Sequence, residues 1–98
     1  MQVRILDVAE RDLEDGYRFY ERQSPGLGSY FLDSLYSDID SLSYFGSIHR
    51  LVFGYHRFLS KRFPFAVYYQ IVEDVVIVKA VLDCRRNPSW IRERLIKG

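Results

Sequence analysis

The stretch FAVYYQIVEDVVIVKAVLD, residues 65–83, decides the fold. Two runs rich in β-branched and aromatic residues, 65–72 and 75–83, are separated only by Glu73 and Asp74, which predicts a β-hairpin with a two-residue turn. Both runs are apolar at consecutive positions instead of alternating with polar residues. We therefore expect two central strands that are covered on both faces.

Two further strands are expected around this hairpin. Residues 54–61 are typical of a strand that leads into it, and residues 2–6, with Val3 and Ile5 on one side, are typical of a short first strand. Residues 43–54 are rich in glycine and serine at their ends and are expected to form a loop.

The segment between the first strand and the loop has a helical period twice. Asp7 and Glu10 have the spacing of a capping box and predict the start of the first helix. Ser24 is expected to cap the second helix, with Pro25 in its first turn. Because the connection is short, the two helices should be antiparallel and should pack on one face of the sheet. Their apolar stripes consist of Ala9, Leu13, Gly16, Tyr17 and Tyr20, and of Leu27, Phe31, Leu35, Ile39 and Leu42.

The hairpin is followed by a basic segment, CRRNPSW, residues 84–90. If the strand continued through Arg85 and Arg86, their side chains would point to opposite faces, so we expect one to face a partner and the other to pair with Asp83 or Glu93. Trp90 is expected to pack against the sheet or the second helix, with an interface role as the alternative.

The predicted fold class is therefore α+β. The expected order is a strand, two antiparallel helices, a three-stranded antiparallel meander and a short C-terminal helix over residues 89–97. With 98 residues, of which 48% are hydrophobic and 28% charged, the chain should form a single domain, residues 1–98.

Composition restricts the surroundings and partners of the protein. The N-terminus lacks the apolar run of a signal peptide and no segment reaches membrane-spanning length, which predicts a cytoplasmic protein without a membrane partner. Residues 1–49 hold four Arg and nine Asp or Glu, a net charge of −5, whereas residues 50–98 hold ten Lys or Arg and four acids, a net charge of +6. This asymmetry fits either a basic face for an anionic partner or attraction between the two halves of one fold.

Several classes of site lack support in the sequence. His49, His56 and Cys84 are too few and too scattered for a zinc site, so we expect no metal. One cysteine also excludes an internal disulfide. No phosphate-binding loop, dinucleotide-binding glycine motif or nucleophile elbow is present, and we expect no cofactor.

Three stretches, taken together, resemble the RelE/ParE superfamily of bacterial toxins. They are SPGLGSYFLDSL (24–35), KRFPFAVYYQI (61–71) and VLDCRRNPSWIRERL (81–95). The combination of PGLG with a terminal Arg-Arg-Asn-Pro-x-Trp is more similar to the ParE, or plasmid-stabilisation, branch. The resemblance implies the toxin of a type II toxin–antitoxin module, which inhibits DNA gyrase by binding and is neutralised by a cognate antitoxin, with no direct DNA binding except through that antitoxin.

The RelE branch of the same superfamily implies an alternative, a ribosome-dependent endonuclease that cuts messenger RNA. That branch usually carries a Tyr or His near its C-terminus, yet no Tyr or His follows Tyr69 here, so we lean against an enzyme. His56, Tyr55, Tyr68 and Tyr69 remain as candidate acids or bases. A third possibility is an inactive or regulatory relative.

Basic residues supply the candidate contacts for either target. We expect them to converge, because the strand at 54–61 and the exit of the last strand could share one edge of the sheet. A nuclease would use Arg57, Arg62 and Arg85 around the phosphate. The candidate target contacts for gyrase are Arg57, Lys61, Arg62, Arg85, Arg86 and Trp90.

An antitoxin that folds onto its toxin needs a hydrophobic surface, and the candidates are Tyr20, Phe31, Tyr36 and Phe58. Seven Phe and eight Tyr are many for so small a core. Some aromatic surface should therefore be exposed, which would make the free protein poorly soluble without its antitoxin.

Overall fold

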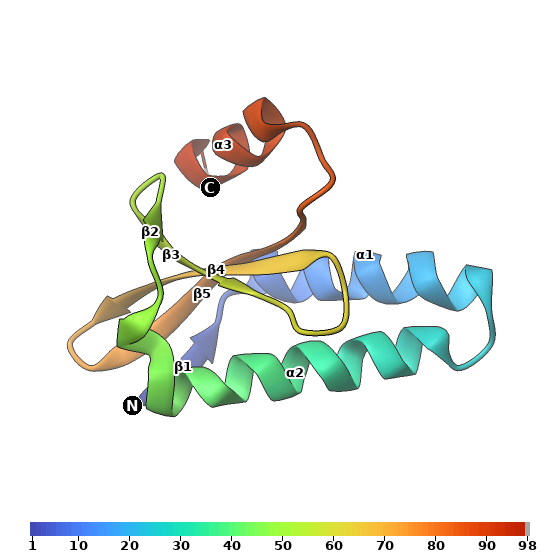
Figure 1. Ribbon diagram of the computed structural model, residues 1–98, viewed down its shortest axis with the longest axis horizontal. Coiled ribbons are helices and arrows are strands. Elements are labelled where there is room, and N and C mark those ends of the chain that lie inside the picture. Colours follow the sequence, from blue (N-terminus) through green and yellow to red (C-terminus); the bar gives the residue numbers. More distant parts are fainter. Residues whose placement is uncertain (98) are drawn as a thin grey trace.

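A computed structural model describes residues 1–97 of the protein and confirms the predicted α+β fold (Figure 1). The order is a strand, two antiparallel helices, an antiparallel meander and a short C-terminal helix. No helix within residues 1–97 has the length and apolar character that crossing a bilayer would require. The elements are β1 (Gln2–Ile5), α1 (Asp7–Gln23), α2 (Leu27–Phe45), the 3-10 helix η1 (Gly46–Ile48), β2 (Leu51–Val52), β3 (Tyr55–Leu59), β4 (Phe65–Val72), β5 (Val75–Asp83) and α3 (Pro88–Lys97).

The strands form one mixed sheet in the order β1-β5-β4-β3-β2. β1 pairs with β5 in parallel, and the other neighbours are antiparallel. The expectation that the strand at 54–61 and the exit of the last strand share an edge is wrong, because β4 lies between β3 and β5.

The β4–β5 hairpin has the predicted strand bounds. Val72 pairs with Val75, so Glu73 and Asp74 form a two-residue turn. Both turn residues have positive φ, 48° and 66°, as a type I′ turn requires. This turn matches the right-handed twist of the two strands and fixes their register.

A bulge in β5 gives the hairpin its two buried faces. Tyr68 pairs with Ala80 and Tyr69 pairs with Val78, so Lys79 is inserted as an extra residue in β5. Strand side chains alternate between faces, and the insertion shifts that alternation by one position. Val76 and Val78 therefore face α1 and α2, whereas Ala80 and Leu82 face the other side of the sheet.

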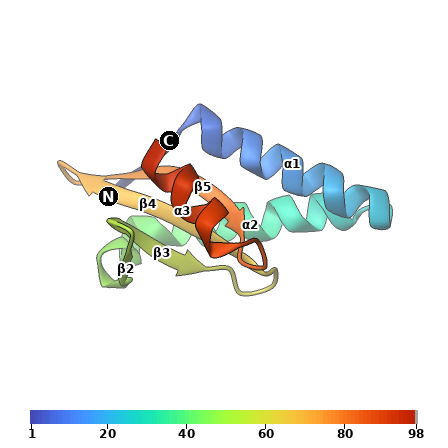
Figure 2. The ribbon, with the colours of Figure 1, turned by 90° about the horizontal axis from the view of Figure 1, so that it is seen from above.

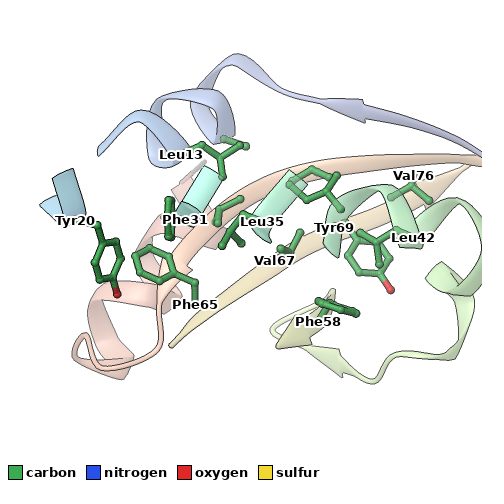
Figure 3. Close-up of a cluster of buried hydrophobic side chains, with 14 residues drawn as sticks. Leu13, Tyr20, Phe31, Leu35, Leu42, Phe58, Phe65, Val67, Tyr69 and Val76 are labelled. Atoms are coloured by element: carbon green, nitrogen blue, oxygen red, sulfur yellow. The ribbon is translucent and has the colours of Figure 1, made fainter. Parts of the chain in front are cut away.

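The larger core lies between the sheet and the helix pair (Figure 3). Phe31 and Leu35 of α2 and Leu13 of α1 are at most 1% exposed and pack over Val67 and Tyr69 of β4. The predicted two-helix layer on one face is thereby confirmed. α3 covers the opposite face of the sheet, where it crosses β4 and β5 (Figure 2) and buries Ile91 and Leu95 against Ala66, Tyr68, Ala80 and Leu82.

Both predicted helix caps are wrong. The N-cap of α1 is Leu6, and neither it nor the N-cap of α2, Gly26, makes a capping hydrogen bond through a side chain. The Glu21 carboxylate caps α2 instead, since it accepts hydrogen bonds from the backbone N–H of Gly26 at 3.1 Å and of Gly28 at 3.0 Å. Gly26 has a φ of 89°, which glycine adopts without strain, and Ser24 lies two residues before this N-cap with an extended backbone.

Residues 43–54 are more ordered than the predicted loop. α2 continues to Phe45, and η1 and β2 follow within the same stretch. A histidine pair on the helix side of the sheet holds this segment. The Tyr69 hydroxyl donates to the Gly46 carbonyl and accepts from Nδ1 of His49 at 2.8 Å, and Nδ1 of His56 donates to the His49 carbonyl at 2.7 Å.

His49 should make the stability of the protein depend on pH. Burial, followed by the nearby His56, lowers the pKa of His49 below that of the unfolded chain. The folded state then binds fewer protons, so stability is fully present above the unfolded pKa of about 6.5 and falls as the pH drops towards the folded value. Urea unfolding at about pH 7.5, 6.5 and 5.5 should show this loss, as the unfolded His pKa lies within that range.

The matched control is His49→Asn, which keeps a donor for Tyr69 but does not titrate. Its free energy of unfolding should fall less over the same range. A wild-type protein whose stability is constant across the range would contradict the assignment.

Candidate partner-binding site

The turn that follows β5 holds the first arginine against its own strand. The Arg85 backbone N–H donates to Asp83 Oδ1 at 2.8 Å, and its guanidinium contacts both carboxylate oxygens, with Nη2 to Oδ2 at 2.7 Å. This hydrogen-bonded pair lowers the pKa of Asp83. Burial raises the pKa of Tyr20, and the positive charge of Arg85 offsets part of that rise. The predicted Asp83 ion pair is therefore made by Arg85, and the strand ends before either arginine.

Arg86 is exposed, as Arg85 is, but it stacks on a tryptophan. Its guanidinium carbon lies 3.8 Å from the centroid of the Trp90 ring, and that of Arg94 lies 5.7 Å away. Trp90 is half-buried against the α3 side of the sheet, as predicted. Stacking on Trp90 orients the Arg86 guanidinium, which prepares this exposed cation to bind a carboxylate or phosphate.

α3 is attached to the rest of the protein by a partly buried ion pair. Arg94 donates from Nη1 and Nη2 to the two Asp12 oxygens at 2.9 and 2.8 Å. Asp12 Oδ2 also accepts a hydrogen bond from the backbone N–H of Val81 at 3.1 Å. The paired part of β1 ends opposite Val78, so β1 does not reach Val81. One carboxylate thus connects α1, β5 and α3.

A cavity of about 380 Å³ lies beside this ion pair, between α1, the end of β5 and the start of α3. Phe19, which is 43% exposed, and Phe65 supply apolar surface. Charged residues of both signs line the cavity. Such a mixture suits a protein segment with one apolar anchor and flanking charges. The lining consists of Asp12, Asp15, Gly16, Phe19, Arg22, Phe65, Val81, Leu82, Asp83, Arg86, Trp90 and Arg94.

The five candidate cations occupy three separate places. Arg57 lies in the middle of β3, paired across the strands with Tyr68 on the α3 side. Lys61 and Arg62 lie in the β3–β4 loop against α2, where the Arg62 guanidinium carbon is 5.9 Å from the Tyr30 ring. Arg85 and Arg86 belong to the turn after β5, which meets that loop through the hydrogen bond from Cys84 N to the Pro64 carbonyl at 2.8 Å.

Most of the residues expected to contact an antitoxin are in the core. Phe31 is 0% exposed, and Tyr20 and Phe58 are each 8% exposed, so the folded chain offers almost none of their surface to a partner. Tyr36 is half-buried and donates to Glu10 Oε2 at 2.8 Å. The expectation of surplus exposed aromatic surface is confirmed by Phe19, Tyr30, Tyr44, Phe45 and Phe53, which are 43 to 82% exposed.

The candidate acids and bases for RNA cleavage are engaged in structural contacts. Burial raises the pKa of Tyr69 to about 12 and also raises that of Tyr68, so both hydroxyls stay protonated at neutral pH. Tyr55 donates to the Leu95 carbonyl at 3.2 Å. Among residues 1–97 no group of three or more His, Cys, Asp or Glu side chains is placed to hold a metal ion.

The family model described as ParE toxin of type II toxin-antitoxin system, parDE, matches residues 3–88. The chain belongs to this ParE toxin family. A solved structure described as the chromosomal ParDE TA system from P. aeruginosa is similar with a TM-score of 0.74 at 15% identity, over 83% of this chain and 92% of that chain. At this identity the likeness shows the ParE fold. Comparison with curated proteins gives no match.

Asp12 and Arg94 are residues of the candidate site that the sequence analysis missed in this ParE family member. The sequence does contain a signal for Asp12. Asp12 lies three residues after Ala9 and four before Gly16, on the buried stripe of α1, and a carboxylate in that position requires a partner. The identity of that partner, 82 residues away, follows only from the fold.

Removal of the Asp12 carboxylate should strongly destabilise the toxin. Asp12→Ala leaves Arg94 without its partner and Val81 with a buried unpaired N–H, at a cost of about 3 kcal/mol in the free energy of unfolding. Asp15→Ala is the matched control, because Asp15 is an exposed carboxylate on the same helix whose one ion pair within residues 1–97 is with Arg18. Urea unfolding measures both, and equal losses in the two variants would contradict the role assigned to Asp12.

Proposed function

We propose that this protein is the toxin of a bacterial ParDE-type module that binds DNA gyrase, blocks replication and is neutralised by a cognate antitoxin. The observation that carries the proposal is the ParE family match over residues 3–88. Its site of action is then the cytoplasm, where gyrase acts on DNA, and plasmid stabilisation is its expected role. Binding without catalysis also agrees with the engagement of Tyr55, Tyr69 and His56 in hydrogen bonds that hold the fold.

The surface that we assign to the target is formed by Arg86, Trp90 and the neighbouring cavity. An oriented guanidinium on a half-buried tryptophan has the character of a binding hot spot, which combines a cation with a large rigid apolar group. Arg85 contributes less, because Asp83 already occupies its hydrogen-bond donors. Arg57 in β3, and Lys61 and Arg62 in the β3–β4 loop, lie apart from this surface and are secondary candidates for target contact.

The ribosomal nuclease remains the second candidate because of one observation. Arg57 lies beside Tyr68 on the α3 face, and its buried Nε makes no hydrogen bond within residues 1–97. A phosphate could supply that missing partner. Such a nuclease would combine Arg57 with Arg62 and Arg85 around the RNA, with messenger RNA and the ribosome as partners.

Pulse-labelling after induction without antitoxin distinguishes the targets. Thymidine incorporation should fall before amino-acid incorporation if gyrase is the target. The reverse order would replace the gyrase proposal with the nuclease. If growth and the incorporation of both labels stay unchanged while soluble protein accumulates, the protein is instead an inactive or regulatory relative.

Single substitutions give an independent prediction. Arg86→Ala should weaken gyrase binding about tenfold or more and reduce toxicity, because it removes an oriented cation at the centre of the proposed surface. Arg18→Ala is the control, since Arg18 is an exposed cation of α1 that pairs with Glu14 and Asp15. Binding is measured with purified gyrase, with antitoxin binding as a check on folding. Loss of toxicity in Arg57→Ala, with Arg86→Ala still toxic, would contradict this surface.

A further inference from the structure

A second, smaller cavity lies on the other side of the molecule from α3, between α2 and the β3–β4 loop. Its volume is about 150 Å³, enough for a small ion with some water, given that one water occupies about 30 Å³ in the liquid. α2 contributes Ser34, Ser37 and Asp38, which share one helix face at spacings of three and four residues. The loop contributes Lys61 and Arg62.

The loop is held in place against α2. Ser60 Oγ donates to Asp38 Oδ2 at 2.8 Å, and Ser60 N donates to the Phe65 carbonyl at 2.8 Å. Phe63 packs edge-on against Phe31 of α2, with ring centroids 5.1 Å apart. The two cations therefore start from a backbone that is ordered before any ligand arrives, which lowers the entropy cost of binding.

The cavity has an excess of positive charge and of hydrogen-bond donors. Two cations face one carboxylate, and within residues 1–97 neither Lys61 nor Arg62 forms an ion pair. Ser34 and Ser37 add hydroxyl groups. A tetrahedral oxyanion can accept hydrogen bonds from all four side chains at once.

Ser34 provides a second, independent observation at this cavity. The residue is 7% exposed, and its hydroxyl oxygen is buried without a hydrogen-bond partner in residues 1–97. Buried hydroxyls are nearly always hydrogen-bonded, and Ser34 lines the cavity, so a change of its χ1 rotamer would turn the unpaired hydroxyl towards a bound group and give it a partner.

Asp38 decides which oxyanion fits. Its carboxylate is 7% exposed and Ser60 occupies Oδ2, which leaves Oδ1 as an acceptor at the cavity. An anion that carries a proton can donate to this oxygen, whereas an anion without one is repelled by it. Sulfate and phosphodiesters have no proton at neutral pH, but inorganic phosphate and phosphate monoesters can retain one.

We propose that this cavity binds a protonated phosphate group, from inorganic phosphate or a small phosphate monoester. The ligand would contact Lys61 and Arg62 from the loop and the serine hydroxyls from α2, and its P–OH group would donate a hydrogen bond to Asp38 Oδ1. The backbone of a nucleic acid, a chain of phosphodiesters, is excluded by the same carboxylate.

The test is an NMR titration of the full chain at neutral pH and constant ionic strength. The probes are inorganic phosphate, phenyl phosphate, sulfate and dimethyl phosphate. Phosphate or phenyl phosphate should give saturable shifts at the amides of Ser34, Ser37, Lys61 and Arg62, and the tighter of the two identifies the source of the group. Sulfate and dimethyl phosphate should bind about tenfold more weakly or worse. Equal affinity for dimethyl phosphate would overturn the proposal and indicate a nucleic-acid contact.

Variants separate the site from general charge attraction. The double variant Lys61→Ala/Arg62→Ala should lose phosphate affinity by about tenfold or more. Arg4→Ala/Arg11→Ala removes the same charge from two exposed positions on β1 and α1 and should bind as the wild type does. Equal losses of phosphate affinity in the two double variants would show that the binding is non-specific charge attraction and would overturn the proposed site.

Asp38→Asn tests the selectivity. An asparagine oxygen still accepts from Ser60 but no longer repels an unprotonated anion, so sulfate and phosphate should bind within about threefold of each other. If this variant does not fold, Ser34→Ala gives a second test, since it removes only the unpaired hydroxyl and should weaken phosphate binding without loss of stability. Unchanged phosphate affinity in Ser34→Ala would contradict the site.

Discussion

Burial of both faces of the β4–β5 hairpin is the constraint on which the rest of the structure depends. Two adjacent strands with apolar residues on both sides need two covering layers, one from α1 and α2 and one from α3. The bulge at Lys79 distributes the side chains of β5 between these layers. Asp12 then fixes the layers to each other, because its carboxylate binds a backbone N–H of β5 and the guanidinium of Arg94 in α3.

Local sequence predicted most of the elements because their signals are local. The turn at Glu73–Asp74 and the bounds of β4 and β5 followed from composition, and the helix pair followed from two apolar stripes. The predicted cap of α2 failed because Glu21 reaches forward from α1 to Gly26 and Gly28, a contact that no short motif describes. The predicted cap of α1 failed because Asp7 is already inside the helix, with Leu6 as N-cap. β2 was missed because two residues carry no periodicity and are held by pairing with β3.

The candidate site was predictable in residue type but not in arrangement. The sequence indicated that Arg85 and Arg86 differ in role, and the structure assigns the Asp83 pair to Arg85 and the tryptophan stack to Arg86. The predicted meander already placed β4 between β3 and β5, an order that is incompatible with a shared edge and that divides the basic residues among three places. Phe31, Tyr20 and Phe58, which were expected to contact an antitoxin, lie on the helix and strand faces that form the core. The exposed aromatic residues are at other positions.

The pairing of β1 with β5 has a consequence for synthesis of the toxin. Gln2 lies opposite Val75, so the first strand made joins the last one. On the ribosome the helix pair can form early from local contacts, but its apolar face stays uncovered until the hairpin emerges. Completion of the sheet is therefore a late event that needs nearly the whole chain. During that interval the nascent protein is exposed to chaperones and proteases, and its yield depends on how quickly the final strand arrives.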